Sequence, residues 1–311
     1  MGPARVGGDD GRRGTWRALA LLALLGGTAD ASDLGCATYD RPVATGRVST
    51  ALPELSGLAA SGRHAGIFWS HNDSGNAFVL YAMRETGAIA AAFPIRGGNA
   101  SDVEDVAVGP CARNDPAPCV YLADTGDNFH RRTSAQIFRV REPETLAARP
   151  LVAARLTFTY ADGGHDVEAI LVDPRTADVY LITKSLLGLG DLYRLDTTAV
   201  GGADARAVRI ASLPSGDAFD AATTAASVHP SGERVLVRTY RFVWEFRRPG
   251  ATSLADVLAT KPVSLPTASD GLPEAIAYLR DGRGYLLAGE GAGTTIRRVG
   301  CRDATPAATR P

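Results

Sequence analysis

Short runs of apolar and β-branched residues recur along the chain, and each begins beside a Glu, Ser or Thr. The clearest copies are Asp102–Val108, Asp166–Val172 and Pro273–Tyr278, and weaker copies are Leu55–Ala59 and Thr223–Val228. Repetition at a spacing of roughly 50 residues, with room for four short strands in each period, is the sequence pattern of a β-propeller. The pattern therefore predicts an all-β fold, and within that class a β-propeller.

A second pattern supports the same register. The predicted third strands mostly alternate polar and apolar residues, and most carry an aromatic residue at the same point. These strands are Leu80–Arg84, Ile137–Arg141, Leu192–Asp196, Val243–Arg247 and Thr295–Val299. Two patterns that agree on the units predict five blades. Six blades is the alternative, because the second unit is long.

The last repeat is one strand short, since its final predicted strand is Ile296–Val299. The segment Arg47–Ser49 can supply the missing strand, so we expect an N-terminal strand to close the last blade. Helical periodicity is confined to Pro143–Ala148 and Ser253–Ala259, which we interpret as loop insertions.

The N-terminal residues have the features of a secretory signal peptide. Arginines precede the apolar run Ala18–Leu25, and Ala29–Ala31 is a small-residue cleavage site. The apolar run is too short to span a bilayer. We expect a signal peptide over residues 1–31, one propeller domain over 32–301 and a disordered tail over 302–311. The protein is then exported, to the periplasm or outside the cell.

The four cysteines fit this location, because disulfides form in oxidising compartments. Four cysteines allow three pairings. Cys111 and Cys119 flank a turn-rich loop between two predicted strands, whereas Cys36 and Cys301 lie near the two ends of the mature chain. A closed ring of blades brings those ends together. We therefore expect the pairs Cys111–Cys119 and Cys36–Cys301.

The charge of the chain narrows the class of partner. The composition is that of an ordinary globular protein, with 45% hydrophobic residues and a net charge of −1. This near-neutral balance gives no support to an electrostatically driven nucleic-acid binder. We expect a monomer without a membrane span, whose partner is a small molecule or a surface ligand.

Candidate site residues come from two places in each repeat. In a propeller, the start of each first strand and the turn between the second and third strands open on one face. The predicted first strands open at Ser56, Glu104, Glu168, Thr224 and Glu274. We interpret Glu104, Glu168 and Glu274 as metal ligands, because clustered carboxylates need a cation, a proton or a guanidinium nearby. Oxygen ligands without thiols or paired imidazoles favour Ca²⁺ or Mg²⁺.

The turns on that face supply the remaining candidates. The predicted ligand-binding residues are Asp73, Asp124, Asp127, Asn128, Lys184 and Arg238. For a catalytic function, the candidate general bases are His71 and Glu290. A purely structural role is the alternative for all of them. Glu at a strand start can bond backbone amides of the next blade, Asp and Asn are ordinary turn formers, and the two basic residues can simply pair with acids.

Several motifs together suggest a family. They are Asn72–Gly75, Val103–Ala107, Asp124–Asn128, Arg141–Pro143, Asp166–Ala169 and Arg238–Tyr240. In these motifs the chain resembles a largely uncharacterised group of secreted bacterial β-propellers. It resembles more distantly the phytase esterase-like and SdiA-regulated propellers. The resemblance covers about Leu55 to Glu290 and specifies the fold better than an activity. In calcium-dependent lactonase propellers a Glu that opens an inner strand is a metal ligand, a role that Glu104, Glu168 and Glu274 would share.

Two functional classes follow from this reasoning. The first is a secreted binding module that captures a ligand or a metal ion on its acidic face. The second is a metal-dependent hydrolase of phosphoester or lactone type, in which the cation polarises the substrate and activates a water. A propeller can carry out either function. A protein-interaction scaffold is a third, weaker hypothesis.

Overall fold

The structure is a computed structural model that describes residues 36–195, 205–214 and 222–302. All of them belong to one compact unit, Ala31–Pro311. The expected signal peptide, residues 1–31, lies outside the described residues. So does the expected tail, except for Arg302, which belongs to the last strand.

The fold is all-β, and the one helix among the described residues is α1, Leu254–Leu258. The Ser253 hydroxyl caps this helix by accepting a hydrogen bond from the Asp256 amide. The helix falls inside the insertion expected at Ser253–Ala259. In the part of the chain that the structure describes, no helix is long and apolar enough to cross a membrane.

The strands in the described part of the chain pair mainly with their neighbours in sequence, and they form four sheets. The first sheet contains β3 (Leu55–Ala60), β4 (Ile67–Asn72), β5 (Val79–Arg84), β6 (Ile89–Arg96) and the short β10 (Leu151–Val152). The largest sheet begins with β7 (Val103–Ala112), β8 (Asp115–Asp124), β9 (Ala135–Arg141) and β11 (Ala154–Tyr160). It continues with β12 (Val167–Val172), β13 (Val179–Thr183), β14 (Asp191–Leu195) and β15 (Arg206–Ser212).

The other two sheets follow in the chain. The third contains β16 (Thr223–Val228), β17 (Arg234–Thr239), β18 (Val243–Arg247) and β19 (Val263–Leu265). The fourth contains β20 (Leu272–Tyr278), β21 (Gly284–Glu290), β22 (Thr295–Arg302), β2 (Val43–Arg47) and β1 (Thr38–Tyr39). The two halves of the largest sheet are antiparallel meanders, joined only by a short parallel pairing of β11 with β15. Among the described residues, the sheets therefore comprise five antiparallel four-stranded units, with the short strands β1 and β10 added at two of their edges.

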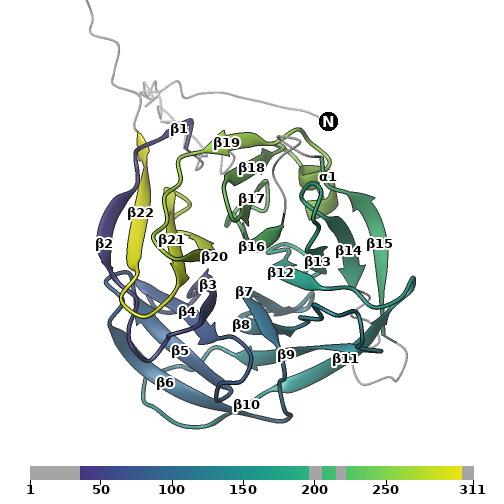
Figure 1. The fold of residues 1–311 in the computed structure, drawn as a ribbon, viewed down its shortest axis with the longest axis horizontal. Helices are drawn as coiled ribbons and strands as arrows, with labels where there is room; N and C mark the ends of the chain where they lie inside the picture. The colour runs from purple at the N-terminus through teal and green to yellow at the C-terminus, as the bar shows by residue number, and fades with distance from the viewer. Residues whose placement is uncertain (1–35, 196–204, 215–221, 303–311) are drawn as a thin grey trace, which may run out of the picture. The chain divides into compact units, whose positions relative to one another are not determined.

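The first strands of these units are neighbours in a closed circuit. β3 contacts β7, β7 contacts β12, β12 contacts β16, β16 contacts β20, and β20 contacts β3. Figure 1 shows these strands around the centre of the view, with the later strands of each unit farther out. Apolar side chains fill the space between successive units. Trp69, Phe93 and Phe138, for example, share the core between the first unit and the second.

An N-terminal strand completes the last unit, as expected from the sequence, because β2 pairs antiparallel with β22. The expected segment Arg47–Ser49 was wrong, since only its first residue belongs to β2. Val48 leaves the ladder, and its amide donates to the carbonyl of Thr294 at 2.9 Å while its side chain is buried. Val48 is apolar, buried and hydrogen-bonded, so the sequence pattern does not distinguish it from a strand residue.

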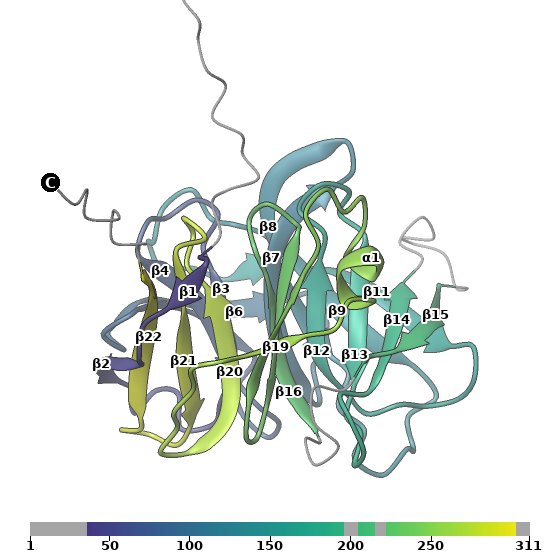
Figure 2. The ribbon, with the colours of Figure 1, turned by 90° about the horizontal axis from the view of Figure 1, so that it is seen from above.

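Two disulfides join the pairs of cysteines expected from the sequence. Cys36 is bonded to Cys301 with a Cα–Cα distance of 5.1 Å, and Cys111 to Cys119 with 4.9 Å. The first disulfide lies where β1 pairs with β22. The second clamps the long hairpin of β7 and β8, which extends beyond the neighbouring strands in Figure 2. Structural disulfides indicate an oxidising compartment.

The carboxylate of Asp105 links two of the inner strands, β7 and β12, by hydrogen bonds. It accepts hydrogen bonds from the amide of Val106 in its own strand β7 at 2.8 Å and from that of Ile170 in β12 at 3.0 Å. The amide of Ala226 in β16 also favours the charged form of this carboxylate electrostatically. A Cβ atom at Gly57 of β3 would lie only 2.6 Å from an Asp105 oxygen, and the backbone there has a φ of +75°. Glycine is therefore required beside this carboxylate.

Replacing Asp105 should destabilise the fold through these amides. In Asp105→Asn only one side-chain oxygen remains as an acceptor, so at least one buried amide loses its partner. We expect a loss of about 1–3 kcal/mol in the free energy of unfolding. Chemical denaturation measures it, with Glu144→Gln at an exposed residue as the control. Equal stability of the two variants would contradict the bridging role.

The two disulfides should differ in their contribution to stability. They close loops with sequence separations of 265 and 8 residues. In the chain-entropy model, losing the longer closure costs about 3 kcal/mol more. We therefore expect Cys36→Ser/Cys301→Ser to unfold at lower denaturant concentration than Cys111→Ser/Cys119→Ser. The opposite order would show that the pairing of β2 with β22 already holds the two ends of the chain together without the terminal disulfide.

Candidate functional site

Every inner strand has a β-bulge close to its start. The register with the second strand shifts between Val103 and Asp105 in β7, and between Val167 and Ala169 in β12. Similar shifts occur in β3, β16 and β20. The extra residue in a bulge is unpaired, and its side chain is turned away from the regular alternation. The bulged residues of β7 and β12 are Glu104 and Glu168, so local backbone geometry aims both glutamates.

Carboxylates from three units come together at these bulges. Oxygen atoms of Asp73, Asp102 and Glu104 lie within 4.8 Å of one another, and so do oxygens of Glu104, Asp166 and Glu168. Glu104 belongs to both groups, and we call the five residues the carboxylate cluster. Two oxygens bound to one Ca²⁺ at about 2.4 Å can be at most about 4.8 Å apart. Either group therefore has the spacing of a calcium ligand set.

The backbone of Gly126 packs directly against this cluster. A Cβ atom there would lie 2.0 Å from Glu104 Oε1 and 2.5 Å from Asp102 Oδ2. Only a glycine at this position allows the loop between β8 and β9 to approach the carboxylates so closely. Its nearness also excludes water from one side of the cluster.

Glu104, Asp166 and Glu168 of the cluster are buried, Asp73 and Asp102 are half-buried, and positive charge nearby is scarce. Glu104 is 6% exposed and Glu168 is 4% exposed. Lys184 Nζ contacts Glu168 Oε1 at 2.6 Å, and Asp166 accepts a hydrogen bond from the Asp127 amide at 2.7 Å. No donor among the described residues bonds the Glu104 carboxylate. A buried carboxylate without a donor, beside four others, is unstable as an anion unless a cation joins it.

The pKa values of the cluster carboxyl groups reflect their burial and mutual repulsion. Burial, followed by repulsion from Glu168, raises the pKa of Glu104 well above its usual range. Burial also raises the pKa of Glu168 to about 7, although Lys184 opposes the shift. Burial and the neighbouring Asp73 raise the pKa of Asp102 to about 6. Without a cation, the cluster therefore holds protons near neutral pH.

The third glutamate predicted as a ligand lies beside the cluster. Burial and repulsion from the nearby Glu290 raise the pKa of Glu274 to about 8. Repulsion from Glu168 contributes to the same shift, so the residues face one region. Neither Glu274 nor Glu290 belongs to the two groups with ligand spacing.

Asp124 and Asp127 use their carboxylates within the protein. Asp124 accepts hydrogen bonds from Arg132 Nη1 at 2.9 Å and from the Asp102 amide at 3.0 Å. Asp127 accepts from the amides of Arg131 and Arg132, both at 2.8 Å. These bonds fix the loop that carries Gly126. Asn128, the neighbouring candidate, is exposed.

His71 and Arg238 are almost inaccessible, each with 1% exposure. The Nδ1 atom of His71 contacts the carbonyl of Asn72 at 3.0 Å, and burial lowers the pKa of the ring to about 4. Arg238 donates to the carbonyls of Ala275 and Ala288 and thereby ties β17 to β20 and β21. A ligand would reach this guanidinium only by breaking those bonds.

The two inner strands that begin with hydroxyl residues have a different role. Ser56 donates to the carbonyl of Glu104, and Thr224 donates to that of Pro273 at 2.6 Å. Each hydroxyl thus bonds the next inner strand instead of facing the cluster.

Two members of the cluster were not among the predicted site residues, namely Asp102 and Asp166. Both belong to an Asp-Val-Glu triplet, Asp102–Glu104 and Asp166–Glu168. Alternate residues of a strand share a face, so the triplet is a signal that could have identified them. Among the five repeats, the triplet occurs only in the two units that carry Glu104 and Glu168.

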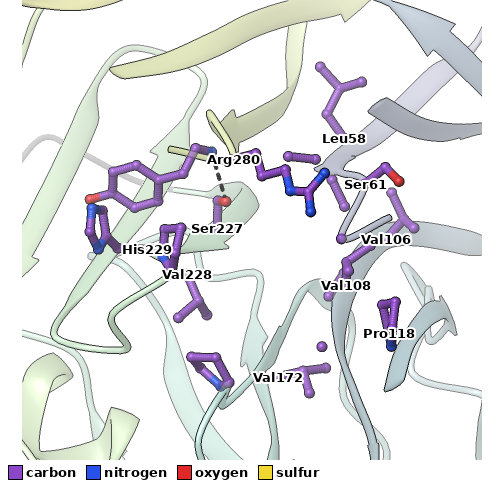
Figure 3. Close-up of a pocket in the computed structure, with 18 of the residues that line it drawn as sticks. Leu58, Ser61, Val106, Val108, Pro118, Val172, Ser227, Val228, His229 and Arg280 are labelled. Atoms are coloured by element: carbon purple, nitrogen blue, oxygen red, sulfur yellow. Dashed lines mark hydrogen bonds between the residues drawn. The ribbon is translucent and has the colours of Figure 1, made fainter. Parts of the chain in front are cut away.

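A cavity of about 390 Å³ lies at the other ends of the inner strands. Its walls include Leu58, Val106, Val172 and Val228, which Figure 3 shows around a common space together with Arg280. The cavity is mainly apolar, and none of the cluster carboxylates lines it. The acidic and apolar sites therefore occupy opposite ends of the same five strands.

Compared with models of known protein families and with curated proteins, the chain has no significant match. The assignment of a function therefore depends on the chemistry of the carboxylate cluster.

The raised pKa values predict how stability depends on pH in a chelating buffer. The pKa of Glu168 rises from 4.5 to about 7 and that of Glu274 from 4.5 to about 8. Between these values the folded protein keeps protons that the unfolded chain has released, so stability falls as pH rises. Each such group contributes a slope of up to about 1.4 kcal/mol per pH unit.

The informative window for this measurement is pH 6.5 to 8. Burial lowers the pKa of His71 from 6.5 to about 4, and this effect makes stability rise with pH but is complete near pH 6.5. Chemical denaturation across the window should show falling stability, with a smaller slope in Glu168→Gln. A flat or rising profile in the unsubstituted protein would contradict the raised pKa values.

Proposed function

We propose that the protein is an exported, monomeric five-bladed β-propeller whose carboxylate cluster binds a divalent cation, Ca²⁺ or Mg²⁺. In this proposal each four-stranded unit is one blade, and β2 and β22 share the last. The closed circuit of inner strands supports this architecture. The motif resemblance to secreted bacterial propellers supports the same assignment.

The Glu104 carboxylate is the observation that carries the metal proposal. It is buried, lacks a hydrogen-bond donor among the described residues and is common to both groups of three carboxylates. Oxygen ligands at this spacing suit Ca²⁺, which binds six to eight oxygens. They suit Mg²⁺ less well, because Mg²⁺ binds oxygens at shorter distances. Glu104, Asp102 and Asp73 would hold the ion from one side, and Asp166 and Glu168 from the other.

The protein then acts as a ligand-binding module, in which the bound ion supplies the positive charge that an anionic ligand needs. Lys184 adds a second cation at the edge of the cluster, with its Nζ atom 5.9 Å from the centre of the Tyr240 ring. The alternative is a metal-dependent hydrolase of phosphoester or lactone type. Glu290 is its more accessible candidate base, because His71 is buried.

Thermal unfolding with and without divalent cations tests the metal proposal. Saturating Ca²⁺ at 100 times its Kd should stabilise the protein by about 2.7 kcal/mol. Glu104→Gln removes the shared charge and should abolish this stabilisation. It should also relieve repulsion, so that the cation-free variant melts no lower than the unsubstituted protein at pH 8. Glu144→Gln, at an exposed residue outside the cluster, should keep the full response.

Calorimetric titration with Ca²⁺, Mg²⁺ and Mn²⁺ then ranks the ions. A melting temperature that ignores all three would rule out the cation site. Turnover of a phosphoester or lactone that requires the bound ion and is lost in Glu290→Gln would favour the hydrolase over the binding module.

A further inference from the structure

A second cleft lies between the second and third units, away from the carboxylate cluster. It has a volume of about 400 Å³. We call it the Arg139 cleft, and its principal lining residues are Cys111, Tyr121, Ile137, Arg139, Leu156 and Val179. The volume is within the range of small-molecule sites and equals that of about a dozen water molecules.

The walls of the cleft continue the apolar core between the two units. Cys111, Tyr121, Ile137 and Val179 belong to that core cluster, and Leu156 packs against it. The clamped hairpin of β7 and β8 forms a further wall, because its disulfide joins Cys111 to Cys119. The space is thus a gap in otherwise close packing. The strands around it are held in place by their backbone hydrogen bonds and by the disulfide.

Arg139 introduces a positive charge into this apolar space. Its Nη1 atom donates to the carbonyl of Cys111. No carboxylate of the described residues lies within ion-pair distance of its guanidinium. Arg113, also in the cleft, pairs with Asp178 at 3.2 Å, and Asp115 pairs with Arg141. Of these lining residues, Arg113 is therefore paired with a carboxylate and Arg139 is not.

We propose that the Arg139 cleft binds a small apolar molecule that carries one carboxylate. The apolar walls receive the hydrocarbon part, and the guanidinium receives the carboxylate through charge-assisted hydrogen bonds. This site is independent of the proposed cation site, because the two share no residue.

Octanoate and its neutral analogue octanamide are suitable probes, since they differ in the charged group. Saturation-transfer NMR titrations on the intact, disulfide-bonded protein should show octanoate binding more tightly than octanamide. Arg139→Gln should weaken octanoate binding by about tenfold to a hundredfold, the usual effect of losing a charge-assisted bond. Octanamide binding should change little, which separates a lost charge from a damaged cleft.

A second variant and a matched control complete the test. Ala154 pairs with Arg139 across β11 and β9, so its side chain is on the cleft side of the sheet. Ala154→Phe should fill the space and abolish binding of both probes without removing a charge. Arg280→Gln removes an arginine from the other apolar cavity and should leave both affinities unchanged.

Three results would overturn the proposal: no octanoate binding at millimolar concentration, equal octanoate affinity in Arg139→Gln, or loss of binding in Arg280→Gln alone. Melting temperatures of the variants identify any that fail to fold, and in that case the Ala154→Phe result decides.

Discussion

The inner strands depend on a single buried carboxylate. Their inward edges carry backbone groups that no further strand can pair, and such groups are costly when they are removed from water. Asp105 bonds such groups in β7 and β12, and the absence of a side chain at Gly57 leaves the carboxylate the necessary room. The equivalent positions in the other units are Ala169, Ala225 and Ala275, which fit the same crowded centre. Asp105 is thus an acidic residue at a position where other units have small residues, and it joins neighbouring units.

The same strands explain why acidic residues gather at one end. A bulge at an equivalent place in each repeat turns one side chain out of the regular alternation. In β16 that side chain is Thr224, whose hydroxyl bonds the adjacent strand β20. Where it is a glutamate, it adds a charge that neighbouring units cannot neutralise. The same bulge with different side chains therefore produces both the hydrogen bonds between adjacent strands and the candidate site.

The sequence predicted the all-β class, the disulfide pairs and the participation of an N-terminal strand, because these follow from periodicity and from the spacing of cysteines. It placed Glu104 and Glu168 at strand openings, where they indeed meet. It did not reveal that Asp105 would bond Ile170, since partners so distant in sequence leave no local pattern. Nor did it show that Asp127 would be satisfied by nearby amides. Turn-forming and ligand-binding aspartates have the same local signature, and only burial and partners separate them.

The pairing of β2 with β22 constrains the order in which the protein can fold. The two strands are separated by about 250 residues, so the closure of the circuit has a very high contact order. β2 is synthesised early, and it waits with an unpaired edge until β22 follows. During that interval the edge is available to other chains, a hazard that native proteins limit by keeping edge strands short and charged. β2 has five residues and ends in Arg47. The Cys36–Cys301 bond can form only after this wait, and it then tethers the segment before β2 to β22, so the two strands stay near each other even when their ladder opens.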